Sequence, residues 1–146
     1  MGSQFECYRG VVHPWLCDNM GHMTTRHYTA MFDDASYHMF AALGFTPDHL
    51  AAGVGIADVK MTTSFLAELN TGALLVIKGH VTRVGTKSLT AFYRMENLHT
   101  GETAATLEAV TTQFDLKSRR AMPLLPEIRA KAERYLSSGD DDAARP

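Results

Sequence analysis

The sequence has few cysteines, few prolines and no excess of charge of one sign. Two cysteines and five prolines occur among 146 residues, and 14 Lys and Arg residues against 16 Asp and Glu give a formal net charge of −2. This balance excludes the basic surface that characterises nucleic-acid-binding proteins, so nucleic acid is not an expected partner. The cysteines, Cys7 and Cys17, have neither metal-ligand spacing nor the pattern of a disulfide framework. We therefore expect free thiols in a reducing compartment.

Long apolar runs are also missing. No run approaches the roughly 18 residues that a membrane span requires, and the N-terminus lacks the basic and then apolar pattern of a signal peptide. These absences predict a cytoplasmic protein without a membrane partner. A hydrophobic content of 45% is enough for one core. We expect a single domain over residues 1–136 and a disordered, acidic tail over residues 137–146.

The periodicity of apolar residues divides the chain into one long helix and several strands. From Thr24 to Leu43 apolar side chains recur every three or four residues, and Gly44 follows as a helix stop. After Gly53 the period changes to two, which is typical of strands. The expected strands are 5–15 (interrupted near Pro14), 56–65, 73–84, 88–98 and 103–116, and the expected short helices are 46–52 and 127–136.

Short turns join the last three strands, so these strands are expected to pair as an antiparallel meander. The long helix then has to bury its apolar stripe against one face of the sheet. The order of elements predicts an α+β fold in which an antiparallel sheet of about five strands wraps around a long central helix.

The segment from Asp18 to Tyr28 contains the candidate catalytic groups. Asp18, Gly21 and His22 lie in a short loop directly before the long helix. A carboxylate in this position can cap a helix, but it can also act beside the free N–H groups of the helix N-terminus. Both interpretations remain open on local sequence alone.

Residues 15–44 contain an ordered series of motif residues: Trp15 is followed by Asp18, the Gly21-His22 pair, Tyr28 six residues after the histidine, and Asp33. This spacing resembles that of the hotdog-fold acyl-CoA thioesterases, in particular the 4-hydroxybenzoyl-CoA thioesterase group. The resemblance extends over about residues 5–125. Family members often carry Asn and Arg where this chain has Thr24 and Ser36. The spacing from Asp18 to Met23 is also similar to that of the family subset that acts on small cationic acyl-CoAs such as betainyl-CoA.

The resemblance implies that the substrate is an acyl-CoA and that Asp18 is either a nucleophile or a general base. The backbone N–H of Thr25 is the expected oxyanion donor. His22, Tyr28 and Asp33 are further catalytic candidates. His22 is also interpretable as a structural hydrogen-bond donor, and Tyr28 as a core residue with a satisfied hydroxyl group.

Coenzyme A carries phosphates, so its site should include basic groups. Two clusters flank predicted turns. The first consists of Arg83, Lys87 and Ser88, and the second of Arg119 and Arg120. The resemblance implies that such turns approach the nucleotide and the pantetheine arm. Thr62 and Thr63 place hydroxyl groups midway along a strand. They are candidates for substrate contact, although ordinary strand propensity also explains them.

Neither a metal nor a cofactor is expected, because the histidines lack ligand spacing and the family uses no metal. Two alternatives remain. A hotdog dehydratase or hydratase would place its acid and histidine elsewhere, and a non-catalytic acyl-CoA-binding module would not need a carboxylate at position 18.

The exposed edge expected of a sheet wrapped on one helix predicts a homodimer or homotetramer. The acyl group, whether aromatic, short-chain or cationic, is left open.

Overall fold

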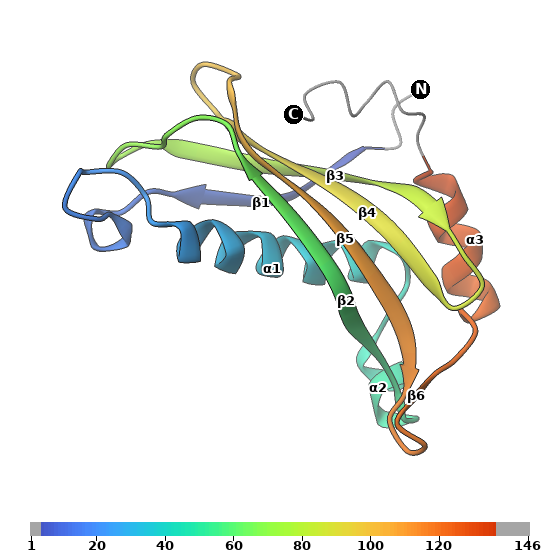
Figure 1. Ribbon diagram of the computed structural model, residues 1–146. Coiled ribbons are helices and arrows are strands. Elements are labelled where there is room, and N and C mark those ends of the chain that lie inside the picture. Colours follow the sequence, from blue (N-terminus) through green and yellow to red (C-terminus); the bar gives the residue numbers. More distant parts are fainter. Residues whose placement is uncertain (1–3, 137–146) are drawn as a thin grey trace.

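The computed structural model describes residues 4–136, and the expected disordered tail at 137–146 lies outside these residues. One long helix lies in the concave face of a curled antiparallel sheet (Figure 1). The elements follow in the order β1 (Phe5–Val11), η1 (Pro14–Leu16), α1 (Thr25–Ala42), α2 (Pro47–Ala51), β2 (Val54–Phe65), β3 (Leu74–Val84), β4 (Ser88–Asn97), β5 (Thr103–Asp115), β6 (Arg120–Ala121) and α3 (Pro126–Arg134).

The strands are arranged in the order β1-β3-β4-β5-β2, with the short β6 paired to β5. Strands β3, β4 and β5 form the expected antiparallel meander. Strand β2 crosses the molecule to pair with β5, while β1 pairs with β3 at the other end. The α+β architecture predicted from the sequence is confirmed.

One expected strand end was wrong, and one strand pair was not predicted. The first strand ends at Val11 instead of continuing to Trp15, and Pro14, Trp15 and Leu16 form a 3-10 turn. Proline fixes φ and has no N–H to donate to a ladder, so the strand ends before it. The strand pair β5–β6 was also missed, because a two-residue strand gives no periodic signal.

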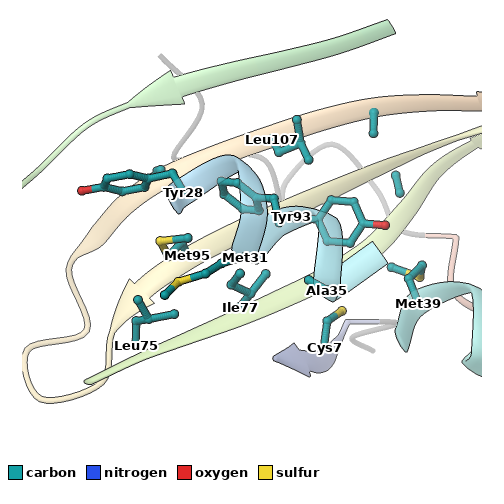
Figure 2. Packing of buried hydrophobic residues seen from close by; sticks show 14 of the residues in the cluster. Cys7, Tyr28, Met31, Ala35, Met39, Leu75, Ile77, Tyr93, Met95 and Leu107 are labelled. Carbon is teal, nitrogen blue, oxygen red and sulfur yellow. The ribbon is translucent and has the colours of Figure 1, made fainter. Parts of the chain in front are cut away.

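The core lies between α1 and the sheet. Buried side chains recur along α1 at three- and four-residue spacing, as the sequence predicted; they are Tyr28, Met31, Phe32, Ala35, Met39 and Phe40. Figure 2 shows Met31, Ala35 and Met39 facing Ile77 and Tyr93 of the sheet. Burial of this stripe holds the helix in place, and its N-terminus is thereby fixed beside the loop that contains Asp18.

Candidate active site

Asp18 lies in a tight loop between η1 and α1. Its backbone N–H donates to the carbonyl of His22 at 2.9 Å, and the N–H of Gly21 donates to the carbonyl of Asp18 at 3.1 Å. Gly21 has φ of 82°, a left-handed conformation that glycine adopts without steric cost. Oδ1 of Asp18 accepts from the N–H of Met20 at 2.8 Å and from the N–H of His22 at 3.4 Å. Both contacts use the same oxygen, so they orient the carboxylate and leave Oδ2 outside the turn.

The N-terminus of α1 lies next to this loop. Thr24 is the residue that precedes the helix, but its side chain makes no capping hydrogen bond. Its hydroxyl donates instead to the carbonyl of Leu16 at 3.4 Å. The first N–H groups of a helix have no intrahelical acceptor, so those of Thr25 and Arg26 are donors at the positive end of the helix dipole.

These groups share a cavity of about 310 Å³. Asp18, His22, Thr25 and Tyr28 contribute to its lining from the loop and the first turn of α1, and Phe65 and Glu68 contribute from the end of β2 and the segment after it. Four of the five residues expected to be catalytic therefore lie around one cavity. One of the lining residues, Phe65, belongs to β2, the last strand of the sheet.

His22 faces Glu68 rather than Asp18. Its Nε2 lies 3.2 Å from Oε2 of Glu68, while its backbone N–H contacts the Asp18 carboxylate. Glu68 was not predicted from the sequence, because the segment that carries it reaches the loop only through a bridge between His22 and Asn70. The contact keeps a negative group near the imidazole at the rim of the cavity.

Tyr28 is 4% exposed and packs edge-on against the ring of Phe65. Its hydroxyl group donates to the carbonyl of Ala67 at 3.5 Å. Burial raises the pKa of Tyr28, so the hydroxyl stays protonated at neutral pH. These contacts are those of a core tyrosine whose edge reaches the cavity.

Asp33 lies about two turns after Thr25 on α1. It lines a different cavity, of about 530 Å³, between α1, α2 and the start of β2. Within one chain it is therefore separated from Asp18. Thr62 and Thr63 lie on β2, opposite Glu108 and Leu107 of β5, and line neither cavity.

The two basic clusters lie at one end of the sheet. Lys87 is in the turn between β3 and β4, after the exposed Arg83 near the end of β3 and before the half-buried Ser88 at the start of β4. Arg119 is in the turn between β5 and β6, and Arg120 is the first residue of β6. Backbone hydrogen bonds tie the turn between β3 and β4 to the segments that flank the other turn: the N–H of Leu124 donates to the carbonyl of Thr86 at 3.0 Å, and the N–H of Gln113 donates to the carbonyl of Lys87 at 2.8 Å. The two clusters, which are separate in the sequence, thus lie at the same end of the sheet.

This end is remote from Asp18 in the same chain. Arg120 pairs with Asp115, and Asp115 pairs with Val54 at the start of β2. The Asp18 cavity is lined by Phe65, at the end of β2. Eleven residue steps separate Val54 from Phe65, which corresponds to about 36 Å of strand.

Within residues 4–136, no three His, Cys, Asp or Glu side chains lie close enough together to hold a metal ion. No helix in this part of the chain combines the length and the apolar character that crossing a membrane requires.

A family model described as the thioesterase-like superfamily matches residues 12–132, and the chain belongs to this family. A relative from Agrobacterium fabrum, named L-carnitine dehydrogenase/betainyl-CoA thioesterase, is 30% identical over 114 residues, which is 78% of this chain. A relative of the same name from Rhizobium meliloti is 26% identical over 117 residues, or 80% of the chain. The chain spans only 23% of the length of each relative.

Solved structures share the fold. A Staphylococcus aureus protein solved in complex with CoA aligns with a TM-score of 0.83 at 16% identity, covering 92% of this chain and 88% of that one. A predicted thioesterase from Bacillus stearothermophilus gives 0.82 at 19% identity, covering 92% and 98%. A 1,4-dihydroxy-2-naphthoyl-CoA thioesterase from Synechocystis gives 0.78 at 15% identity, covering 88% and 95%. The expected hotdog fold is confirmed.

Proposed function

We propose that this chain hydrolyses acyl-CoA thioesters to the free acid and coenzyme A. The observation that carries the proposal is the shared cavity of Asp18 and the N-terminus of α1. A thioester needs a nucleophile or an activated water at its carbonyl carbon, and hydrogen-bond donors where negative charge develops on oxygen. Asp18 supplies the first requirement and the N–H of Thr25 supplies the second.

Two routes use these groups. In one, a carboxylate oxygen of Asp18 attacks the thioester carbonyl, the thiolate of coenzyme A leaves and takes a proton, and water then hydrolyses the acyl-enzyme anhydride. In the other, Asp18 removes a proton from water as the water attacks, and that proton goes to the departing sulfur. Both routes use Oδ2 of Asp18 for chemistry while Oδ1 holds the loop in shape.

We propose that the complete site is shared between two copies of the chain. Strand β2 pairs with β5 on one side and is the last strand of the sheet. Its exposed apolar side chains include Val59, at 62%, and Phe65, at 50%. Antiparallel pairing of two β2 edges would place the β2 start of one copy, with Arg119 and Arg120, beside the β2 end of the other, with its Asp18 cavity. The basic clusters could then hold the nucleotide of a thioester bound at Asp18 of the partner subunit.

The acyl group is proposed to be small. The cavity at Asp18 is about 310 Å³, and the curated relatives carry betainyl-CoA thioesterase in their names. We therefore propose short and cationic acyl-CoAs as the first substrates to assay.

The test replaces Asp18 by Asn. Asn keeps the side-chain oxygen that accepts from Met20 but removes the negative charge, so kcat should fall by about two to four orders of magnitude while the melting curve barely moves. Asp34→Asn is the matched control, since Asp34 is an exposed carboxylate on α1 outside the cavity. The measurement is release of free thiol from a panel of acyl-CoAs, alongside thermal unfolding.

The outcomes separate the alternatives. Asp18→Asn activity above about a tenth of wild type would reduce Asp18 to a structural residue of the loop. An acyl-CoA-binding module would bind the thioesters and release no thiol. A dehydratase or hydratase would convert enoyl-CoA substrates and leave the thioester bond intact.

A further inference from the structure

The larger of the two cavities is lined by acidic and aromatic side chains. Its volume is about 530 Å³, and it lies between α1, α2 and the first residues of β2. Two of the side chains that line it are carboxylates, Asp33 and Asp58, and three are aromatic, Tyr37, Phe40 and Phe45. Among the described residues, its lining includes no Lys, Arg or His.

The two carboxylates come from different elements. Asp33 is on α1, one turn before Tyr37, and both side chains are exposed. Asp58 is on β2, where its Oδ1 accepts from the Thr111 hydroxyl at 2.7 Å. That bond orients the Asp58 carboxylate from the β5 side and leaves its second oxygen outside the pair.

The aromatic residues add faces that attract cations. Tyr37 is 72% exposed, while Phe40 and Phe45 lie deeper in the wall. The ring of His49 stacks on Phe45 with centroids 5.3 Å apart, but His49 is outside the lining and its Nε2 lies 3.4 Å from Glu127. Aromatic faces combined with negative charge are the features by which proteins bind weakly hydrated organic cations.

We propose that this cavity binds a compact organic cation of the trimethylammonium type, with Asp33 and Asp58 as counter-charges and Tyr37 as an aromatic wall. Two carboxylates without a basic group favour a cation over an anion. A quaternary ammonium cannot donate hydrogen bonds, so its recognition depends on charge and on contact with apolar and aromatic surface, both of which this cavity offers.

The cavity can belong to the substrate site, an inference that rests on the proposed function. Asp58 lies near the start of β2, and the Asp18 cavity lies at its end. In the antiparallel pairing proposed above, these two positions from different copies run beside each other. The cationic head of an acyl group would then enter this cavity while its thioester reaches Asp18 of the partner subunit, and Asp33 and Asp58 would determine specificity.

The kinetic test compares two thioesters of almost the same shape. Trimethylammonioacetyl-CoA and 3,3-dimethylbutanoyl-CoA differ in that a positive nitrogen replaces a neutral carbon. For wild type, kcat/KM should be about tenfold higher with the cationic thioester than with the neutral one. Asp33→Asn and Asp58→Asn should each reduce this ratio several-fold. Asn at position 58 retains an oxygen that can accept from Thr111. Asp34→Asn should leave the ratio unchanged, because Asp34 does not line the cavity.

A binding test does not depend on hydrolysis. Tetramethylammonium chloride is titrated into the full-length protein and followed by calorimetry, with sodium chloride at the same ionic strength as the blank. Binding to wild type and to Tyr37→Phe, with weaker binding to Asp33→Asn, Asp58→Asn and Tyr37→Ala, is the expected result.

Equal kcat/KM values for the two thioesters in wild type would overturn the proposal. So would a wild-type protein that does not bind tetramethylammonium, or equal binding by wild type and both Asp variants. If neither thioester is hydrolysed but tetramethylammonium binds and the Asp variants lose it, the cation site stands and the proposed hydrolysis fails. The two proposals are thus separated by experiment.

Discussion

At the scale of single residues, the proposed function gives Asp18 a structural and a chemical task on different atoms. Oδ1 accepts the loop amides of Met20 and His22, which a capping residue would also do. The adjoining helix N-terminus has no side-chain cap, and Thr25 in its first turn lines the cavity. This division between the two oxygens explains why Asn is an informative replacement, because it changes the charge while keeping the turn.

Cys7 gives a residue-scale prediction about pH. Burial raises the pKa of its thiol to about 12. Between the ordinary thiol pKa and 12 the unfolded chain has lost this proton while the folded chain keeps it, so stability falls as pH rises through that window. The Cys7 thiol should contribute up to about 1.4 kcal/mol of lost stability per pH unit there.

The check is urea unfolding of wild type and Cys7→Ala from pH 8 to pH 11. The alanine variant should lose less stability over this range, since it lacks one of the titrating groups. Parallel pH dependence in the two proteins would contradict the assignment to Cys7.

At the scale of elements, the position of α1 depends on close contact with the sheet. Gly79 of β3 lies under the helix, where an added Cβ would come within 2.9 Å of Cε of Met39 and Cδ1 of Tyr93, and within 3.0 Å of Sγ of Cys7. Helix and sheet approach this closely because no side chain stands between them at position 79. The approach sets the direction of α1 and, through it, where the helix N-terminus meets Asp18.

Gly79→Ala should therefore destabilise the fold by about 1–3 kcal/mol, because three surrounding side chains have to shift. Gly10→Ala serves as the comparison, since its closest contact at 2.9 Å is the outer ring edge of the half-buried Tyr8, which can move. Chemical denaturation of both variants gives the measurement. An equal or smaller loss for Gly79→Ala would show that the helix does not depend on this contact.

At the scale of the whole molecule, the features proposed for the reaction are distributed over both ends of β2. The Asp18 cavity lies at the end of the strand, and the basic turns and the larger cavity lie near its start. One chain alone keeps them about a strand length apart. Assembly through the β2 edge is the simplest way to bring them together.

Light scattering at micromolar concentration should find a dimer or tetramer. Val59→Glu, which places a charge on the exposed edge of β2, should shift the assembly toward monomer and lower thioesterase activity with it. Leu98→Glu is the control, because Leu98 is also exposed but lies in the turn between β4 and β5 and not on the edge strand β2. A wild-type monomer with full activity would refute the shared site.

A second prediction at this scale concerns coenzyme A. Replacing Arg119 and Arg120 together by Ala should raise KM with little change in kcat, and the increase should shrink at high salt because exposed ionic contacts are screened. Steady-state kinetics at low and high ionic strength provide the measurement. An unchanged KM at low salt would place the nucleotide away from this turn.

The sequence by itself determined most of the elements and pointed to the segment proposed to carry the chemistry. Helix α1 was predicted within one residue at each end, because its apolar side chains recur at helical spacing and Gly44 follows it. The Asp18 loop was identifiable because its residues are close together in the chain. Local interactions control both features, so local sequence reports them.

Only the tertiary structure decided which distant residues meet. Glu68 reaches His22, and the two basic clusters come to the same end of the sheet, through strand pairings that join segments far apart in sequence. Asp33, by contrast, is separated from Asp18 because about two turns of α1 carry it to a second cavity, which Asp58 lines from β2. Such contacts arise from the order and register of strands in the sheet, which depend on how the whole chain buries its apolar surface and not on any one segment.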